Sequence, residues 1–588
     1  MKTKNIFLTL ISLFLVIFLF TNCDVSGTVS DIIEPLLTRT PDPVTVLDTY
    51  EKQTCNYLFI MYIDGDNNLH DALYEDLNEM EKALYQYSPK QGSKPSVKIV
   101  ALWDGWKLSG TNYGGAATQI LELGADSTFD FELCSNTLDL TATAYSQNNN
   151  WLNYDPKTET AEANMCDKNT LSNFLKWVDE YYDAKHKILQ FSNHGGGPRS
   201  ALDISQRRGL CWDWTSDEKD PFLKTKDVSD AFEAAGYGKD KEQFDMLIFD
   251  VCLGASIEDS YQFKDYARYL LGSANTVPGS GLDYTKILDN ISTDTTIPDI
   301  GKGIIDDFKY FYTVTFPNIY PEWSERWENE IAYWQSEIDK LSETEKAKLP
   351  SDYAISLAAF SLPDACTFSL IDLSKVDEVA KAVDELADYL GGKESPVGNY
   401  GFYMEENNPD SAITYQKYIG GLYLSRYDSF GKPVYQGTFT WLHDIGFMAA
   451  NIANFCSNLN IPNTDNTETA INEAEVYDVM KNNLKQIAED ITEALQKAIL
   501  FTWREGPYIL GENCDSLYYG AGTKYPYGMT IAGSALASNG TNLVDGYAPD
   551  FYKTDLAFGE DYSWGDLLEY YFGTGKNNDY GALRASTN

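Results

Sequence analysis

Two apolar segments decide the fold of this chain: KILQFSNHGGG at residues 187–197 and FDMLIFDVCLG at residues 244–254. Each is a short apolar run that ends in polar residues and glycine. Runs of this length are typical of strands buried on both faces, as in a parallel sheet covered by helices. The two segments therefore predict parallel strands whose last residues lie at the same edge of one sheet.

The same alternation of strand and helix extends through the first 300 residues. The apolar patterns predict strands at 57–63, 97–103, 187–191 and 244–249, and helices at 71–85, 170–182, 227–235 and 255–266. Strands that alternate with helices indicate an α/β fold, here a predominantly parallel sheet flanked by helices.

The pattern changes after residue 300. Amphipathic spacing predicts helices at 325–341, 376–390, 443–458 and 470–500, whereas the Tyr- and Gly-rich section at 503–572 favours short strands and turns. We expect five parts: a signal peptide at 1–22, a tether at 23–54, an α/β core at 55–300, a mainly helical accessory region at 301–502, and a strand- and turn-rich region at 503–588.

Composition restricts the class of protein and its partners. The chain has 588 residues, 43% of them hydrophobic, with 45 Lys and Arg against 88 Asp and Glu. This apolar and aromatic content excludes disordered and collagen-like classes. A formal charge of −43 repels phosphate backbones, so we expect no nucleic-acid partner.

The N-terminus has the features of an export signal. Lys2 and Lys4 precede an apolar run at 6–20, which is too short to span a membrane and ends just before Cys23. Cys23 stands where a lipoprotein signal places its acylated cysteine. We therefore expect a product attached by lipid to the bacterial cell envelope, with simple secretion as the alternative.

A histidine and a cysteine follow the two deciding segments. His194 comes just before three consecutive glycines, and Cys252 follows the second strand. A thiol beside a histidine and near the start of a helix has a lowered pKa and is a usable nucleophile. For either residue alone, a buried structural cysteine or a turn histidine is the simpler interpretation.

Several segments together resemble the clostripain family of cysteine peptidases, which is related in fold to caspases, legumains and gingipains. The resemblance covers most of the chain from about residue 56. The matching segments are DNNL at 66–69, EANM at 162–165, NHGGG at 193–197, FDVCL at 249–253 with Glu258, and PGSGLDY at 278–284, followed by weaker likeness at 369–373, 527–531, Trp564 and Leu568.

The resemblance implies a caspase-like fold and an exported cysteine endopeptidase that acts on polypeptides. Cys252 would attack the scissile carbonyl and His194 would protonate the leaving amine, without a third member of the catalytic group. The backbone N–H groups of Gly195 and Cys252 would stabilise the oxyanion. The alternative is a catalytically silent surface lipoprotein that binds peptides or a protein partner on the same scaffold.

The residues implied for substrate binding depart from the family pattern. Asp250 matches a position that lines the pocket for a basic P1 side chain, although an Asp at a strand end also commonly caps the next helix. Arg- or Lys-cleaving members carry a second acid near Ser280, which is absent here unless Asp283 substitutes, and Asn275 stands where Glu is common. A preference for Arg or Lys at P1 is thus implied in weakened form.

Two other motifs suggest maturation and metal binding. Arg207 and Arg208 lie between the histidine and cysteine strands, where some family members are cleaved; a plain surface loop is the alternative.

Residues 64–68 with Glu75 imitate part of a calcium loop, but Leu69 occupies the position that requires glycine. We interpret them as a strand-to-helix turn. No cofactor is implied for the chemistry, calcium is allowed by family likeness, and the sequence names no metal ligands.

Overall fold

The computed structural model describes residues 52–88, 94–106, 118–127, 133–137, 150–153, 161–197, 209–214, 222–274, 277–315, 367–391, 442–446, 467–504, 528–532 and 549–567, with shorter stretches between 155 and 544. Arg207, Arg208, Asn275 and Cys23 lie outside the described residues. In the described part of the chain, no helix combines the length and apolar character needed to cross a bilayer.

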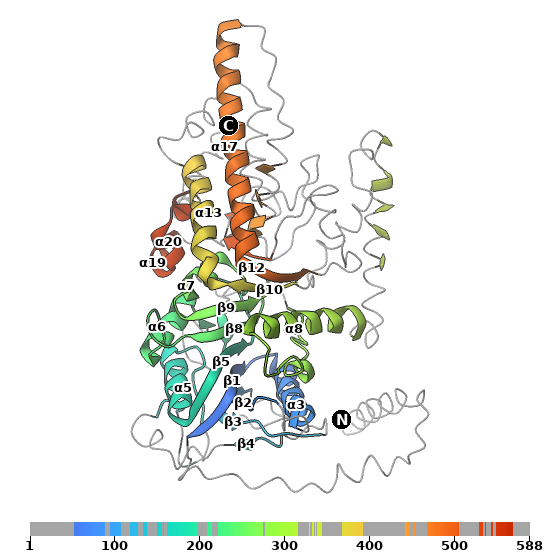
Figure 1. Ribbon diagram of the computed structural model, residues 1–588, viewed down its shortest axis with the longest axis vertical. Helices are drawn as coiled ribbons and strands as arrows, with labels where there is room; N and C mark the ends of the chain where they lie inside the picture. Colours follow the sequence, from blue (N-terminus) through green and yellow to red (C-terminus); the bar gives the residue numbers. More distant parts are fainter. Residues whose placement is uncertain are drawn as a thin grey trace, which may run out of the picture. The chain divides into compact units, whose positions relative to one another are not determined.

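A nine-stranded sheet is the central element (Figure 1). Its strands are β1 Gln53–Gly65, β2 Val97–Gly105, β3 Gln119–Glu122, β4 Asn136–Thr137, β5 Tyr182–Ser192, β8 Phe244–Asp250, β9 Ala267–Gly272, β10 Thr367–Asp372 and β12 Ile499–Arg504. They lie in the order β12-β10-β9-β8-β5-β1-β2-β3-β4. The five strands from β9 to β2 are parallel, and those at both edges pair antiparallel.

Helices cover both faces of this sheet. One face packs α5 Lys168–Tyr181, α6 Thr225–Ala235, α7 Ile257–Phe263, α13 Val376–Gly391 and α17 Thr467–Ala498, and the other packs α3 His70–Tyr87 and α8 Ile297–Tyr310 (Figure 1). Strand β1 contributes Leu58 and Ile60 to the first core and Phe59 and Met61 to the second. Because both faces are buried, the strand reads as a continuous apolar run. The predicted fold class is confirmed.

The predicted elements correspond closely to the observed ones in the first 300 residues, with local differences. The helix expected at 255–266 is α7, which is shorter because Ser256 caps its start and the chain enters β9 at Ala267. His443, expected in a helix, lies in β11 Leu442–Asp444. Strands β10 and β12 come from the region expected to be mainly helical and extend the central sheet. The division into domains remains a prediction.

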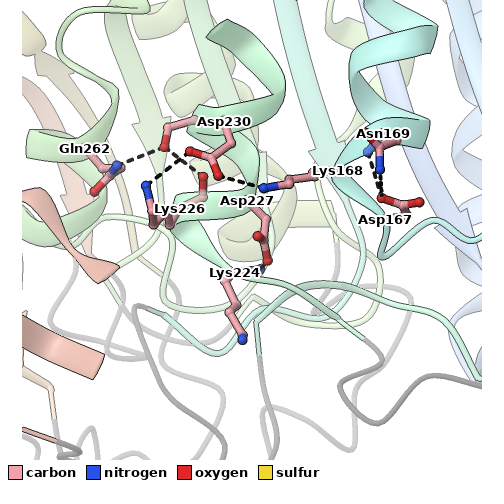
Figure 2. Close-up of polar contacts among 9 residues, drawn as sticks. Asp167, Lys168, Asn169, Lys224, Lys226, Asp227, Asp230 and Gln262 are labelled. Carbon is pink, nitrogen blue, oxygen red and sulfur yellow. Dashed lines mark hydrogen bonds and ion pairs between the residues drawn. The ribbon is translucent and has the colours of Figure 1, made fainter. Parts of the chain in front are cut away.

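Polar contacts join the start of α5 to the middle of α6 (Figure 2). Lys168 at the start of α5 forms an ion pair of 2.8 Å with Asp230 of α6, to which Lys226 also pairs at 3.2 Å. Asp167 caps α5 by accepting from the backbone N–H of Asn169. These groups are partly exposed, so each ion pair contributes at most about 1 kcal/mol and the helices are held mainly by their apolar faces.

Short elements near the C-terminus contact helix α7, which follows Cys252 in the chain. They include β13 Thr530–Ala532, which pairs with β11, and the helices α19 Pro549–Asp555 and α20 Ala557–Asp561. Glu258 of α7 accepts from the backbone N–H of Ala532 at 2.8 Å and from the Tyr552 hydroxyl at 2.7 Å. The indole N–H of Trp564 donates to the Ala532 carbonyl at 2.7 Å. A buried carboxylate thus joins α7 to segments about 270 to 300 residues later.

Candidate active site

His194 and Cys252 follow the ends of two adjacent parallel strands. The register of β5 and β8 pairs Ser192 with Asp250, so the two chains leave the sheet side by side. Gly195 lies against Cys252: a Cβ atom at position 195 would be 2.1 Å from the Cys252 carbonyl oxygen and 2.8 Å from its nitrogen. Only glycine permits this approach. The structure therefore places the loop that begins at His194 directly against the turn that contains Cys252.

Cys252 is half-buried in a strained turn. Its Sγ accepts from the backbone N–H of Val277 at 3.3 Å. The next residue, Leu253, has a φ of 63°, an uncommon conformation for a residue with a side chain. Helix α7 begins five residues after the thiol, and its first turn is capped by the Ser256 side chain. The turn exposes part of the thiol beyond the end of the sheet.

The His194 ring is held by groups from two other segments. Its Nε2 lies 2.9 Å from Oδ1 of Asn68, in the loop that follows β1. An amide oxygen only accepts, so Nε2 donates to Asn68 in this arrangement. The Trp212 ring packs edge-on at 6.0 Å between centroids. The sequence analysis did not identify Asn68 as a partner, although its position after a neighbouring strand was a usable signal.

Asp250 is buried beneath the turn that contains Gly281. Its Oδ2 accepts from the Tyr284 hydroxyl at 2.5 Å and from the backbone N–H of Leu282 at 3.3 Å. Gly281 has a φ of 53°, and a Cβ there would be 2.7 Å from that oxygen. Oδ1 has no hydrogen-bond partner among the described residues. Burial raises the pKa of Asp250 to about 6, opposed by the Tyr284 and Leu282 hydrogen bonds. It is Ser256, not Asp250, that caps α7.

The other two predicted substrate-binding residues have different surroundings. Ser280 is exposed, whereas Asp283 is half-buried and its side chain accepts a hydrogen bond from Thr285 within its own turn. Of these two positions, only Asp283 carries an acid, and its side chain is engaged within its own turn.

Helix α3 provides two acids near Asp250 that were not predicted from the sequence. Glu79 accepts from the backbone N–H of Tyr284 at 2.9 Å, and its pKa is raised to about 8 by burial and then by Asp283. Burial, followed by the charge of Asp250, raises the pKa of Asp76 well above its usual range. Acids on the apolar face of a predicted helix were the available signal.

A second set of acids lies at the ends of β1 and β2. The described residues contain two groups with ligand atoms close enough to share a metal ion: Asp66, Asp104 and Glu162, and separately Glu81, Asp126 and Cys134. Asp64 and Gly65 end β1, and residues 66–69 form the predicted turn into α3.

Comparison with known proteins gives several matches. The family model described as "Clostripain family" matches residues 61–571. Clostripain of Hathewaya histolytica is 28% identical over 245 residues, which cover 39% of this chain and 41% of that protein. The match thus spans less than half the length of that relative.

Solved structures also show likeness at low identity. A secreted C11 cysteine protease from Bacteroides thetaiotaomicron, bound to an irreversible peptide inhibitor, is 15% identical, with 87% of this chain and 99% of that chain covered and a TM-score of 0.45. An inactive zymogen C11 protease from Parabacteroides distasonis is 16% identical, with the same coverage and a TM-score of 0.44.

Proposed function

The chain belongs to the clostripain family, and from this premise we propose that it is a cysteine endopeptidase that hydrolyses polypeptides. The observation that carries the proposal is the contact between Gly195 and Cys252, which sets the histidine loop against the nucleophile turn. It supports a Cys–His dyad at the carboxyl ends of β5 and β8, where α/β sheets bind ligands.

The proposed reaction uses each of these groups at a stated atom. The Cys252 thiolate attacks the scissile carbonyl, and the backbone N–H groups of Gly195 and Cys252 donate to the resulting oxyanion. His194 gives a proton to the leaving amine and then removes one from the water that hydrolyses the acyl-enzyme. Asn68 accepts from Nε2–H and thereby holds the ring in one orientation, and we assign the proton transfer to Nδ1. Asn68 is thus a positioning residue.

Arg or Lys at P1 is the proposed preference. The buried Asp250 carboxylate has one oxygen without a hydrogen-bond partner among the described residues, and its pKa of about 6 makes it mostly ionised at neutral pH. Glu79 and Asp76 add acidic groups nearby. A guanidinium or ammonium group compensates buried carboxylates, which supports this preference over an apolar P1 residue.

A library of fluorogenic peptides that differ at P1 tests the activity. We expect turnover by the wild type with Arg or Lys, none by Cys252→Ala, and normal turnover by the matched control Cys55→Ala, which removes a buried thiol of β1. Asp250→Asn is expected to raise KM for basic P1 residues more than for Met. No turnover by the wild type, even after nicking near Arg208, would instead favour the catalytically silent binding protein.

Export, lipid attachment and self-processing are also proposed, from residues outside the described ranges. The apolar run and Cys23 support a lipid anchor in the cell envelope, and Arg207 with Arg208 supports cleavage between the two catalytic strands. Mass spectrometry of the mature N-terminus tests the first by the mass of acylated Cys23. Two fragments in the wild type and one chain in Cys252→Ala would support self-cleavage at 207–208; two fragments in both would contradict it.

A further inference from the structure

A set of three tryptophans begins at the His194 ring. Trp212 ends the short strand β6 Leu210–Trp212 and packs edge-on against that ring, with 6.0 Å between centroids. Two residues later, Trp214 is 45% exposed and meets the Trp106 ring edge-on at 5.1 Å. We propose that these three tryptophans bind an apolar or aromatic side chain of the peptide substrate, on the side of the leaving amine.

The order of the strands places the tryptophans on that side of the candidate dyad. Strand β8, which leads to Cys252, lies on one side of β5, and strands β1 and β2 lie on the other (Figure 1). Trp106 directly follows β2, and the backbone of Trp212 and Trp214 bonds to the turn after β1. In the proposed reaction the acyl group stays on Cys252, while His194 gives a proton to the leaving amine. A substrate chain that continues past His194 therefore runs toward the tryptophans.

Hydrogen bonds to neighbouring segments fix the backbone of all three tryptophans. The Asn67 side chain donates to the Trp212 carbonyl at 2.7 Å, and the carbonyl of the residue before Asn67 accepts from the Trp214 N–H at 3.0 Å. The Trp106 N–H donates at 2.9 Å to Nδ1 of His70, a buried residue at the start of α3. The rings are thus presented from a backbone that is ordered in advance, which lowers the entropic cost of binding.

The exposure of Trp214 favours contact with a ligand over a role in the core. Trp103, Trp177 and Trp564 are at most 1% exposed, whereas almost half of Trp214 faces solvent although its backbone is held. Aromatic rings at fixed, partly exposed positions are characteristic of binding surfaces, because they offer a large apolar area at a low cost in side-chain entropy. A substrate side chain placed on these rings would remove that area from water.

The distances limit which substrate residues can reach the tryptophans. An extended peptide advances about 3.3 Å per residue, and the Trp212 ring is centred 6.0 Å from the His194 ring. The first two residues of the leaving segment, P1′ and P2′, are therefore those within reach. We assign the apolar preference to these two positions.

Internally quenched peptides that share Arg at P1 and differ only at P1′ and P2′ test the proposal, which rests on the proposed function. In the wild type, we expect kcat/KM for a peptide with Phe or Leu at one of these positions to exceed that of the Gly peptide about tenfold. Trp214→Ala should bring this ratio close to one, and Trp214→Phe should recover part of it. The matched control Tyr85→Ala removes a ring that is 48% exposed near the far end of α3, and it should keep the ratio of the wild type.

Three results of this experiment would overturn the proposal. A wild type that does not distinguish the peptides has no apolar preference at P1′ or P2′. An equal fall in kcat/KM for all peptides in Trp214→Ala would show that the ring supports the structure of the site without contacting substrate. A preference that Trp214→Ala changes at P2 or P3 instead would place the tryptophans on the acyl side.

Calorimetric titration of the same peptides into full-length Cys252→Ala protein separates this binding site from the peptidase function. We expect the Phe peptide to bind about fivefold or more tightly than the Gly peptide, and the difference to disappear when Trp214→Ala is added. Such selective binding without turnover by the wild type would refute the proposed function and leave the binding site intact. Turnover with equal affinities and equal kcat/KM for the two peptides would refute the binding site alone, and neither binding nor turnover would refute both.

Discussion

Replacing Glu258 by Gln is expected to remove a pH-dependent part of the stability. Glu258 is 0% exposed. Its Oε1 accepts from Ala532 and Tyr552, and Oε2 is buried without a hydrogen-bond partner among the described residues. Burial therefore raises its pKa from 4.5 to about 7, although the two hydrogen bonds oppose the shift. Gln keeps an acceptor for both donors and carries no charge.

The size and sign of this change in the free energy of unfolding follow from proton linkage. The folded protein holds the Glu258 proton up to about pH 7, whereas the unfolded chain releases it near pH 4.5. The free energy of unfolding contributed by this group is fully present below pH 4.5 and is lost as the pH rises to about 7. At about 1.4 kcal/mol per unit, the loss is roughly 3 kcal/mol. Above pH 7 the contribution stays constant.

Urea unfolding at pH 5 and pH 8, followed by tryptophan fluorescence, measures the effect. The difference between Glu258→Gln and the wild type isolates this group from the other buried acids. We expect the variant to gain roughly 3 kcal/mol relative to the wild type between the two pH values. Glu233→Gln, at an exposed position of α6, is the matched control and should show no gain. An equal difference at both pH values for Glu258→Gln would refute the reasoning.

Three further substitutions test other parts of the structure. Gly195→Ala places a Cβ 2.1 Å from the Cys252 carbonyl oxygen. We expect kcat/KM to fall about a hundredfold or more, with little change in far-ultraviolet circular dichroism. Normal kinetics in this variant would contradict the close approach. Asn68→Ala should lower kcat about tenfold, with little change in KM, and shift the pH profile, whereas Asn68→Asp keeps an acceptor and should recover part of the rate. Lys168→Met removes an exposed ion pair with Asp230. We expect urea denaturation to show a loss of about 0.5 kcal/mol in the free energy of unfolding. A loss of several kcal/mol would show that the pair contributes more than its exposure indicates.

The middle of the sheet was predictable from the sequence because its strands are buried on both faces. Such strands read as apolar runs, and the turns after them contain glycine and polar residues. The edge strand β12 was not predictable from the sequence. Strand β12 continues directly from α17 at Ile499, so a helical periodicity hides its start. Only pairing with β10, more than 100 residues earlier, makes it a strand.

The positions of His194 and Cys252 after neighbouring strand ends were predictable for the same reason as the strands. His194 and Cys252 follow strand ends, and adjacent parallel strands place their ends together. Contacts between distant segments could not be read in this way. Glu79 reaches the backbone of Tyr284 across 205 positions, and no local pattern records which acid on a helix will face which turn.

The buried acids at this edge of the sheet fall into two kinds, distinguished by their donors. Asp250 receives two hydrogen bonds from neutral groups, which keep its pKa near 6 despite burial. It is therefore mostly ionised at neutral pH, which supports the basic P1 residue that we propose. Asp104 receives one hydrogen bond and faces Asp64 and Glu162, so its pKa is raised well above the usual range. Such surroundings favour the protonated form of the Asp104 carboxyl. Burial thus has different results at the two strands: the hydrogen bonds to Asp250 in β8 keep it ionised near neutral pH, whereas Asp104 in β2 is favoured in its protonated form.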